Sequence, residues 1–162
     1  MNYDNSQTLI IAYAVSNIIG LLFLWVAFIN TKLVRFFFAV LFAWAAWINF
    51  TTACFTPGIY LDYGKSAINI YSTFINGWFA NHITILVTTI AIGQGLIALG
   101  MLLSSKWVTF ACIGTIVFLV SIAPLGLYAA FPFSITVSIA AWIVLQRDDK
   151  MVLWKVLQKQ HI

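Results

Sequence analysis

Glutamate is absent from this 162-residue chain, which holds only four aspartates beside eight lysines and arginines. Charged residues make up 7% of the sequence and hydrophobic residues 63%, whereas soluble domains carry about 25% charge. A chain with so little charge cannot cover a soluble globule, so the composition indicates an integral membrane protein. Its length suits a single domain, residues 1–162, with no room for a separate soluble catalytic domain.

The scarce functional side chains exclude several kinds of chemistry. All four aspartates lie outside the long apolar runs, so no carboxylate within the membrane could carry protons or a coupling ion, which disfavours a proton-driven pump. The two histidines, His82 and His161, are expected on opposite sides of the membrane and cannot build a haem or zinc site together. Cys54 and Cys112 differ in depth by about 20 Å on the helical rise, too far for a disulfide, and are predicted to be free thiols.

Long apolar runs predict five membrane-spanning helices, because a span needs roughly 20 mostly apolar residues. The first run lacks the positive flank of a signal peptide and is longer than a usual signal sequence, so it is read as a helix that stays in the protein. The run from 107 to 145 would be about 58 Å long as one helix, so it must turn back, either at Pro124-Leu125-Gly126 or at Phe131-Pro132. The predicted spans are 9–29, 36–53, 83–103, 107–124 and 127–145.

The basic residues test this count and orient the chain. With five spans, seven of the eight fall on one side, and only Lys65 falls on the other. The positive-inside rule places the seven in the cytoplasm, with the N-terminus outside and the C-terminus inside. The net charge of +4 is therefore a matter of topology and of attraction to anionic lipid, not of nucleic-acid binding. The seven are Lys32, Arg35, Lys106, Arg147, Lys150, Lys155 and Lys159.

Two amphipathic segments are expected at the membrane surfaces. The loop 54–82 is half apolar, and its aromatic residues predict a short helix at the outer interface. Within it, Asp62 and Lys65 are three residues apart and can form a solvated ion pair. The tail 148–160 predicts an interfacial helix on the inner leaflet, with Asp148 and Asp149 at its positive end. This helix would anchor the tail or dock a cytoplasmic partner.

Gln94 stands near the middle of the third predicted span, where an unpaired amide would cost several kcal/mol. Gly93, Gly95 and Gly100 surround it on a helix that a neighbouring backbone could approach closely. Two interpretations stay open: Gln94 hydrogen-bonds across a helix contact, or it lines a cavity that opens toward the outer loop. The candidate ligand-binding residues are Trp44, Trp47, Asn49, Asn76, Trp78, Asn81, His82 and Gln94.

From Arg35 to Leu145 the chain resembles the DoxX-like family of small bacterial membrane proteins. The resemblance rests on the span "RFFFAVLFAWAAWINFTTACFTPGIY", a loop with a short helix, the span "IAIGQGLIALGMLL", the basic turn "SSKW" and two closing spans. It implies a four-helix core in the bacterial inner membrane, to which residues 9–29 add one helix. Family members often carry an acidic residue at the position of Gln94, and some are tied to quinone-linked sulfur oxidation or to membrane redox complexes.

The expected fold is therefore an all-α membrane bundle of five helices with an outer interfacial helix and an amphipathic tail. The sequence favours a non-enzymatic protein with no intrinsic cofactor, which binds a lipid or quinone within its bundle or serves as an accessory subunit of a membrane complex. The alternative is a membrane subunit of a quinone-linked oxidoreductase of the DoxX type. Expected partners are membrane lipids, other subunits or further copies of the chain.

Overall fold

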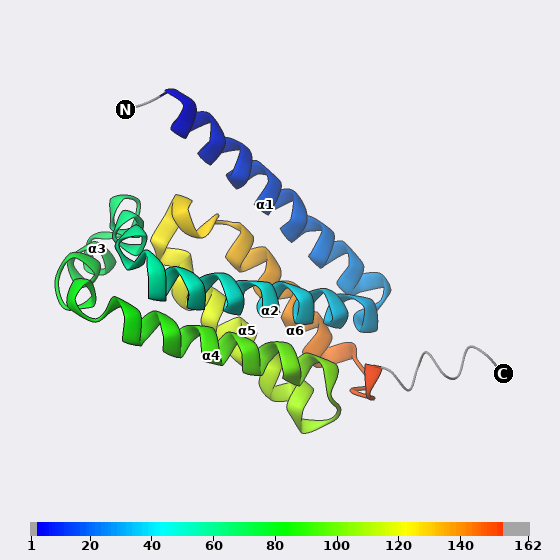
Figure 1. Cartoon of the computed structure of the whole chain (residues 1–162). Coiled ribbons are helices and arrows are strands. Elements are labelled where there is room, and N and C mark those ends of the chain that lie inside the picture. Colours follow the sequence, from blue (N-terminus) through cyan, green and yellow to red (C-terminus); the bar gives the residue numbers. More distant parts are fainter. Residues whose placement is uncertain (1–2, 154–162) are drawn as a thin grey trace.

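The computed structural model describes residues 3–153, with side chains from residue 7 onward, and this part of the chain is built from helices (Figure 1). Short 3₁₀ segments connect the longer α-helices at one end. In chain order the elements are α1 (Tyr3–Ile29), α2 (Thr31–Phe55), η1 (Pro57–Lys65), α3 (Asn69–Asn76), η2 (Phe79–Asn81), α4 (Ile83–Leu102), α5 (Lys106–Ile122), η3 (Ala123–Ala129) and α6 (Phe133–Arg147).

Four of these segments are long and apolar enough to cross a membrane: Gln7–Ile29, Thr31–Phe55, Ile83–Leu102 and Lys106–Ala129. The chain is therefore a multi-pass membrane protein. The helix α6 is also apolar but has only 15 residues, about 22 Å of helical rise against a hydrocarbon core of about 30 Å.

The second and fifth of the predicted spans do not begin where the corresponding helices begin. The fifth was expected over 127–145, but α6 begins only at Phe133, because the chain uses both candidate breakers. It turns at Gly126, whose φ is +70°, and again at Pro132, which directly precedes α6. The second span was expected to begin at residue 36, after Arg35, yet α2 begins five residues earlier. The Asn30 side chain caps it by accepting a hydrogen bond from the backbone N–H of Leu33.

The long helices pack side by side, and those that follow one another in the chain run antiparallel (Figure 1). The most extensive contact is between α2 and α4, and α5 and α6 complete a four-helix group that α1 joins by packing against α6. Gly20 permits this last contact, since a Cβ there would lie 3.0 Å from Phe133. The beginning of α1 diverges from the other helices in Figure 1. After the orientation that the sequence predicts, we call the end with the α1–α2 and α4–α5 turns the inner end, and the end with η1, α3, η2 and η3 the outer end.

Arg35 organises the inner end. Its side chain is fully buried and donates five hydrogen bonds, which matches the five N–H groups of a guanidinium. Nε and one terminal nitrogen donate to the carbonyl of Met101, and that nitrogen also donates to the carbonyl of Leu103. The other terminal nitrogen donates to Asp148 Oδ1 at 2.8 Å and to the carbonyl of Met151. Arg35 thereby satisfies carbonyls that the end of α4 leaves open.

The segment after α6 is not the start of an interfacial helix, which corrects the sequence expectation for residues 148–152. Asp148 is in an extended conformation at the C-cap of α6, and its carboxylate accepts hydrogen bonds from Arg35, from the Thr31 hydroxyl and from the backbone N–H of Lys150. The buried guanidinium of Arg35 stabilises the Asp148 carboxylate more strongly than the partial positive charge of a helix N-terminus would. The rest of the predicted tail helix, from residue 154, lies outside the described residues.

Neighbouring aspartates allow a matched test of this buried pair. We expect Asp148→Asn to lower the free energy of unfolding by about 3–5 kcal/mol, because it leaves the Arg35 charge buried without a counter-ion. Asp149→Asn should cost at most about 1 kcal/mol, since the ion pair of Asp149 with Lys32 is solvent-exposed. Unfolding by denaturing detergent in mixed micelles measures both. Equal losses in the two variants would show that the buried pair has no special role.

Candidate binding site between α2 and α4

Gln94 lies on the buried face of α4, with 3% of its surface exposed. Its Oε1 accepts a hydrogen bond of 2.8 Å from Nδ2 of Asn49 on α2. The Asn49 Oδ1 in turn accepts a bond of 2.8 Å from the Tyr60 hydroxyl on η1. The three side chains therefore form a continuous polar chain from the outer segment to the middle of the helix pair. The interpretation of Gln94 as a hydrogen-bonding contact between helices is confirmed.

Tyr60 supplies the proton at the outer end of this chain. Burial, together with the neighbouring phenol of Tyr63, raises the pKa of Tyr60 to about 12, so the hydroxyl stays protonated at neutral pH and donates to Asn49. Burial also raises the pKa of Tyr63, and the two rings stack with centroids 6.0 Å apart. The polar chain thus fastens η1 onto the α2–α4 pair.

The eight candidate residues do not converge on one cavity. Gln94 and Asn49 bond to each other, whereas the Asn76 amide donates to the carbonyl of Ser72 in its own helix, α3. Trp44 and Trp47 are mostly exposed along α2. The other three, Trp78, Asn81 and His82, lie around the start of α4 at the outer end.

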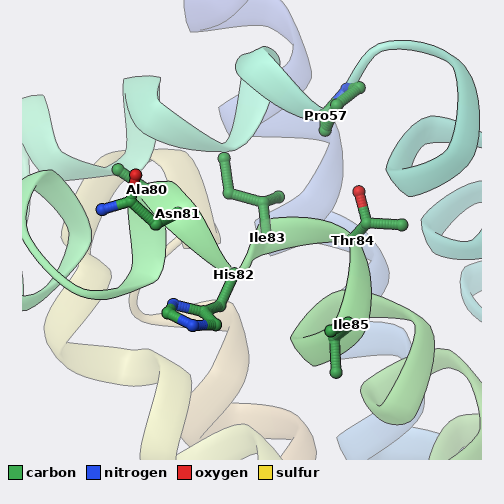
Figure 2. Close-up of a pocket in the computed structure, with 7 residues that line it drawn as sticks. All are labelled: Pro57, Ala80, Asn81, His82, Ile83, Thr84 and Ile85. Carbon is green, nitrogen blue, oxygen red and sulfur yellow. The ribbon is translucent and has the colours of Figure 1, made fainter.

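A pocket of about 230 Å³ opens at the start of α4. Figure 2 shows its lining residues, with Pro57 lying across from the first turn of α4. The His82 ring stacks on Trp78, with centroids 4.1 Å apart and planes 13° apart. Its Nδ1 lies 2.8 Å from the Trp78 carbonyl; because a carbonyl only accepts, this nitrogen carries the proton and donates. The lining residues are Pro57, Ala80, Asn81, His82, Ile83, Thr84 and Ile85.

A larger groove of about 450 Å³ lies between α2 and α4, nearer the middle of the helices. Five small residues form part of its lining, and larger apolar side chains complete it. Of the candidate residues only Trp47 lines this groove. The lining residues are Ala43, Ala46, Trp47, Phe50, Ala91, Ile92, Gly95, Ala98 and Leu99.

Small residues on α4 have two different uses, which their sequence pattern did not separate. A Cβ at Gly100 would lie 2.9 Å from Ala111 and 3.0 Å from the carbonyl of Trp107, so Gly100 permits the close approach of α4 to α5. A Cβ at Gly93 or Gly95 would have nothing within 4 Å. Gly95 therefore leaves space in the groove instead of permitting a helix contact. The small residues of α2 and α4 were the sequence feature from which the groove could have been predicted. They line one groove only because these two helices pack against each other.

The pocket and the groove follow one another along the same face. On α4, Ile85 lines the pocket, and Ile92 and Leu99 line the groove. Residues seven apart lie nearly two full turns apart and share one side of a helix. On the other wall, Pro57 lines the pocket and Phe50 lines the groove. The α2–α4 face therefore offers a polar outer opening above an apolar groove.

The acidic, histidine and cysteine side chains of the described residues do not gather into a metal site. No group of three or more histidine, cysteine or acidic side chains in residues 7–153 could hold a metal ion. Cys54 is an exposed free thiol and Cys112 a buried one.

No protein-family model, curated protein or solved structure matches this chain.

The polar chain makes a quantitative prediction. In a double-mutant cycle of Asn49→Ala and Gln94→Leu, we expect a coupling energy of about 0.6 kcal/mol, and no more than about 1.7, which is the range for hydrogen bonds between membrane helices. Unfolding in mixed micelles gives the four free energies. A coupling of zero would mean that the two amides do not stabilise each other, contrary to their 2.8 Å contact.

Proposed function

We propose that this protein is a small non-enzymatic membrane protein that binds the apolar chain of a lipid or isoprenoid quinone in the α2–α4 groove. The groove itself carries this proposal. Its volume of about 450 Å³ falls within the 300–1,000 Å³ typical of small-molecule sites. All nine residues that line it are apolar or glycine, so an alkyl or isoprenoid chain matches it chemically.

The polar opening at the outer end supports an amphipathic ligand. An apolar chain in the groove would place its polar end near Asn81 and His82, which line the outer pocket. With Nδ1 of His82 donating to Trp78, the other ring nitrogen is an acceptor in the neutral ring, and the Asn81 amide can donate or accept. Lipid headgroups and quinone rings both present carbonyl or hydroxyl oxygens to such groups.

Glycine substitutions test the groove directly. We expect Gly95→Leu to fill it and to abolish retention of the bound molecule, because no neighbouring atom obstructs a side chain there. Gly93→Leu is the matched control: it has the same open surroundings, the same gain in helix propensity and a position outside the groove lining. The measurement is mass spectrometry of organic extracts from each protein after purification in mild detergent.

The wild type and Gly93→Leu should carry the same lipid or quinone in a stoichiometric amount, and Gly95→Leu should lack it. Equal retention by both variants, or loss in both, would contradict the groove as the binding site. The melting temperature of each variant in detergent shows whether either change disturbs the fold.

The proposed topology has five crossings of the bacterial inner membrane, with α6 as the fifth, the N-terminus outside and the C-terminus in the cytoplasm. Its support is the distribution of basic residues: in the described chain, Lys65 lies at the outer end, whereas Lys32, Arg35, Lys106, Arg147 and Lys150 lie at the inner end. The proposed kinship with the DoxX-like family rests on the sequence alone.

Cysteine labelling tests this topology. In a background without native cysteines, we expect Lys65→Cys to react with an impermeant maleimide added to intact cells, and Lys106→Cys to react only after the membrane is opened. Both positions are exposed, so access to the reagent, not burial, decides the result. Labelling of both from the same side would rule out the five-crossing arrangement.

A second candidate function is that of an accessory subunit in a membrane complex. The observation that favours it is the first half of α1, where Ile10, Ile11, Val15 and Ile18 are each about half exposed or more and where the helix diverges from the other helices (Figure 1). A stoichiometric protein partner in the same mild-detergent preparation, with no retained small molecule, would favour this function.

A further inference from the structure

Charge pairing at the inner end is selective. Lys32 forms an ion pair with Asp149, Arg35 with Asp148, and Arg147 lies 5.5 Å from the centre of the Phe28 ring. The two aspartates of the segment after α6 thus neutralise the two cations at the start of α2. Lys106 and Lys150 have no ion pair, side-chain hydrogen bond or cation–π contact within residues 7–153, which leaves their charges available there.

A backbone contact brings these two lysines together. The N–H of Ser105 donates a 2.7 Å hydrogen bond to the carbonyl of Lys150, so Lys150 lies directly beside the residue that precedes Lys106. Lys106 is exposed and Lys150 is half-buried. Two lysines from segments 44 positions apart in the chain therefore lie beside the α4–α5 turn. No acidic side chain of the described chain pairs with either of them.

An exposed apolar stripe begins at the same place. Lys106 stands at the head of a face of α5 that continues through Phe110, Ile113 and Val117, with helical spacings of four, three and four residues. These three apolar side chains are 45% to 63% exposed. Trp107 is also exposed beside Lys106, and tryptophan favours the level of the lipid headgroups. Positive charge thus lies at the end of a surface that acyl chains would cover.

We propose that Lys106 and Lys150 bind the phosphate of an anionic membrane phospholipid whose acyl chains lie along the Phe110–Ile113–Val117 face of α5. Charge complementarity selects an anion, and continuity with the apolar stripe selects a membrane lipid over a soluble phosphate. The site is separate from the α2–α4 groove and does not depend on the function proposed for it. In the proposed topology it faces the cytoplasmic leaflet, whose anionic lipids attract lysines near the surface.

Native mass spectrometry of the full-length protein in detergent tests this site. The probes are dioleoyl phosphatidylglycerol, which is anionic, and dioleoyl phosphatidylcholine, which has the same chains and a phosphate but no net charge. A lysine near an anionic surface contributes about 1 kcal/mol, so each of Lys106→Gln and Lys150→Gln should weaken phosphatidylglycerol binding roughly fivefold, and the double variant by about 20- to 30-fold. Binding of phosphatidylcholine should change little.

Lys65→Gln is the matched control, because it removes the same charge at the opposite end of the bundle. It should leave phosphatidylglycerol binding unchanged, and the double substitution Lys106→Arg with Lys150→Arg should preserve it. Unchanged phosphatidylglycerol binding by the double glutamine variant would overturn the proposal. So would an equal loss in Lys65→Gln, since the effect would then come from net charge. The melting temperature of the double variant should match that of the wild type, because the contact to Ser105 uses the backbone of Lys150.

Discussion

A single buried guanidinium joins three parts of the chain that are far apart in sequence. Arg35 belongs to α2, but its hydrogen bonds end on the last turn of α4 and on the segment after α6. A buried arginine is costly unless its charge and its donors are all satisfied, so the positions of Met101, Leu103 and Asp148 are coupled to one another. The α4–α5 turn and the segment that leaves α6 must both return to α2 for this to occur.

The pairing of Arg35 with Asp148 also decides the charge of the surface around it. Because Asp148 and the neighbouring Asp149 are committed to the start of α2, they do not neutralise Lys106 and Lys150 at the adjacent turn. The Arg35–Asp148 pair, which stabilises the fold, thereby leaves the positive charges of Lys106 and Lys150 at the α4–α5 turn without a counter-ion in the described chain. The basic residues at this end are thus of two kinds: Lys32 and Arg35 pair with aspartates of the bundle, whereas Lys106 and Lys150 pair with none in the described chain.

At the other end, an uncharged polar chain has the corresponding role. Tyr60, Asn49 and Gln94 connect the outer segment to the middle of the α2–α4 pair, and each member satisfies a group that would be costly to bury alone. The amides bond to each other beside the groove, since Ala91 and Ala98 of its lining stand one turn before and after Gln94. The rest of the lining on the same two helices is small or apolar, so the groove itself holds no polar side chain.

Composition and hydropathy by themselves determined the class of the protein: apolar helices, their approximate order and a membrane location, because a long run of apolar residues has few alternatives to a spanning helix. The apolar run 107–145 contained two possible turns, one at Gly126 and one at Pro132. Only the folded chain showed that both are used. The sequence also marked Gln94 as a residue that needs a partner, since an amide at that depth must be satisfied, but Asn49 became its partner only through the packing of α2 on α4. It did not reveal that Asp148 serves Arg35, since 113 residues separate them and Asp148 next to an apolar tail reads equally well as a helix start. Local pattern fixes what each segment is, whereas the choice among polar partners depends on which helix ends meet in space.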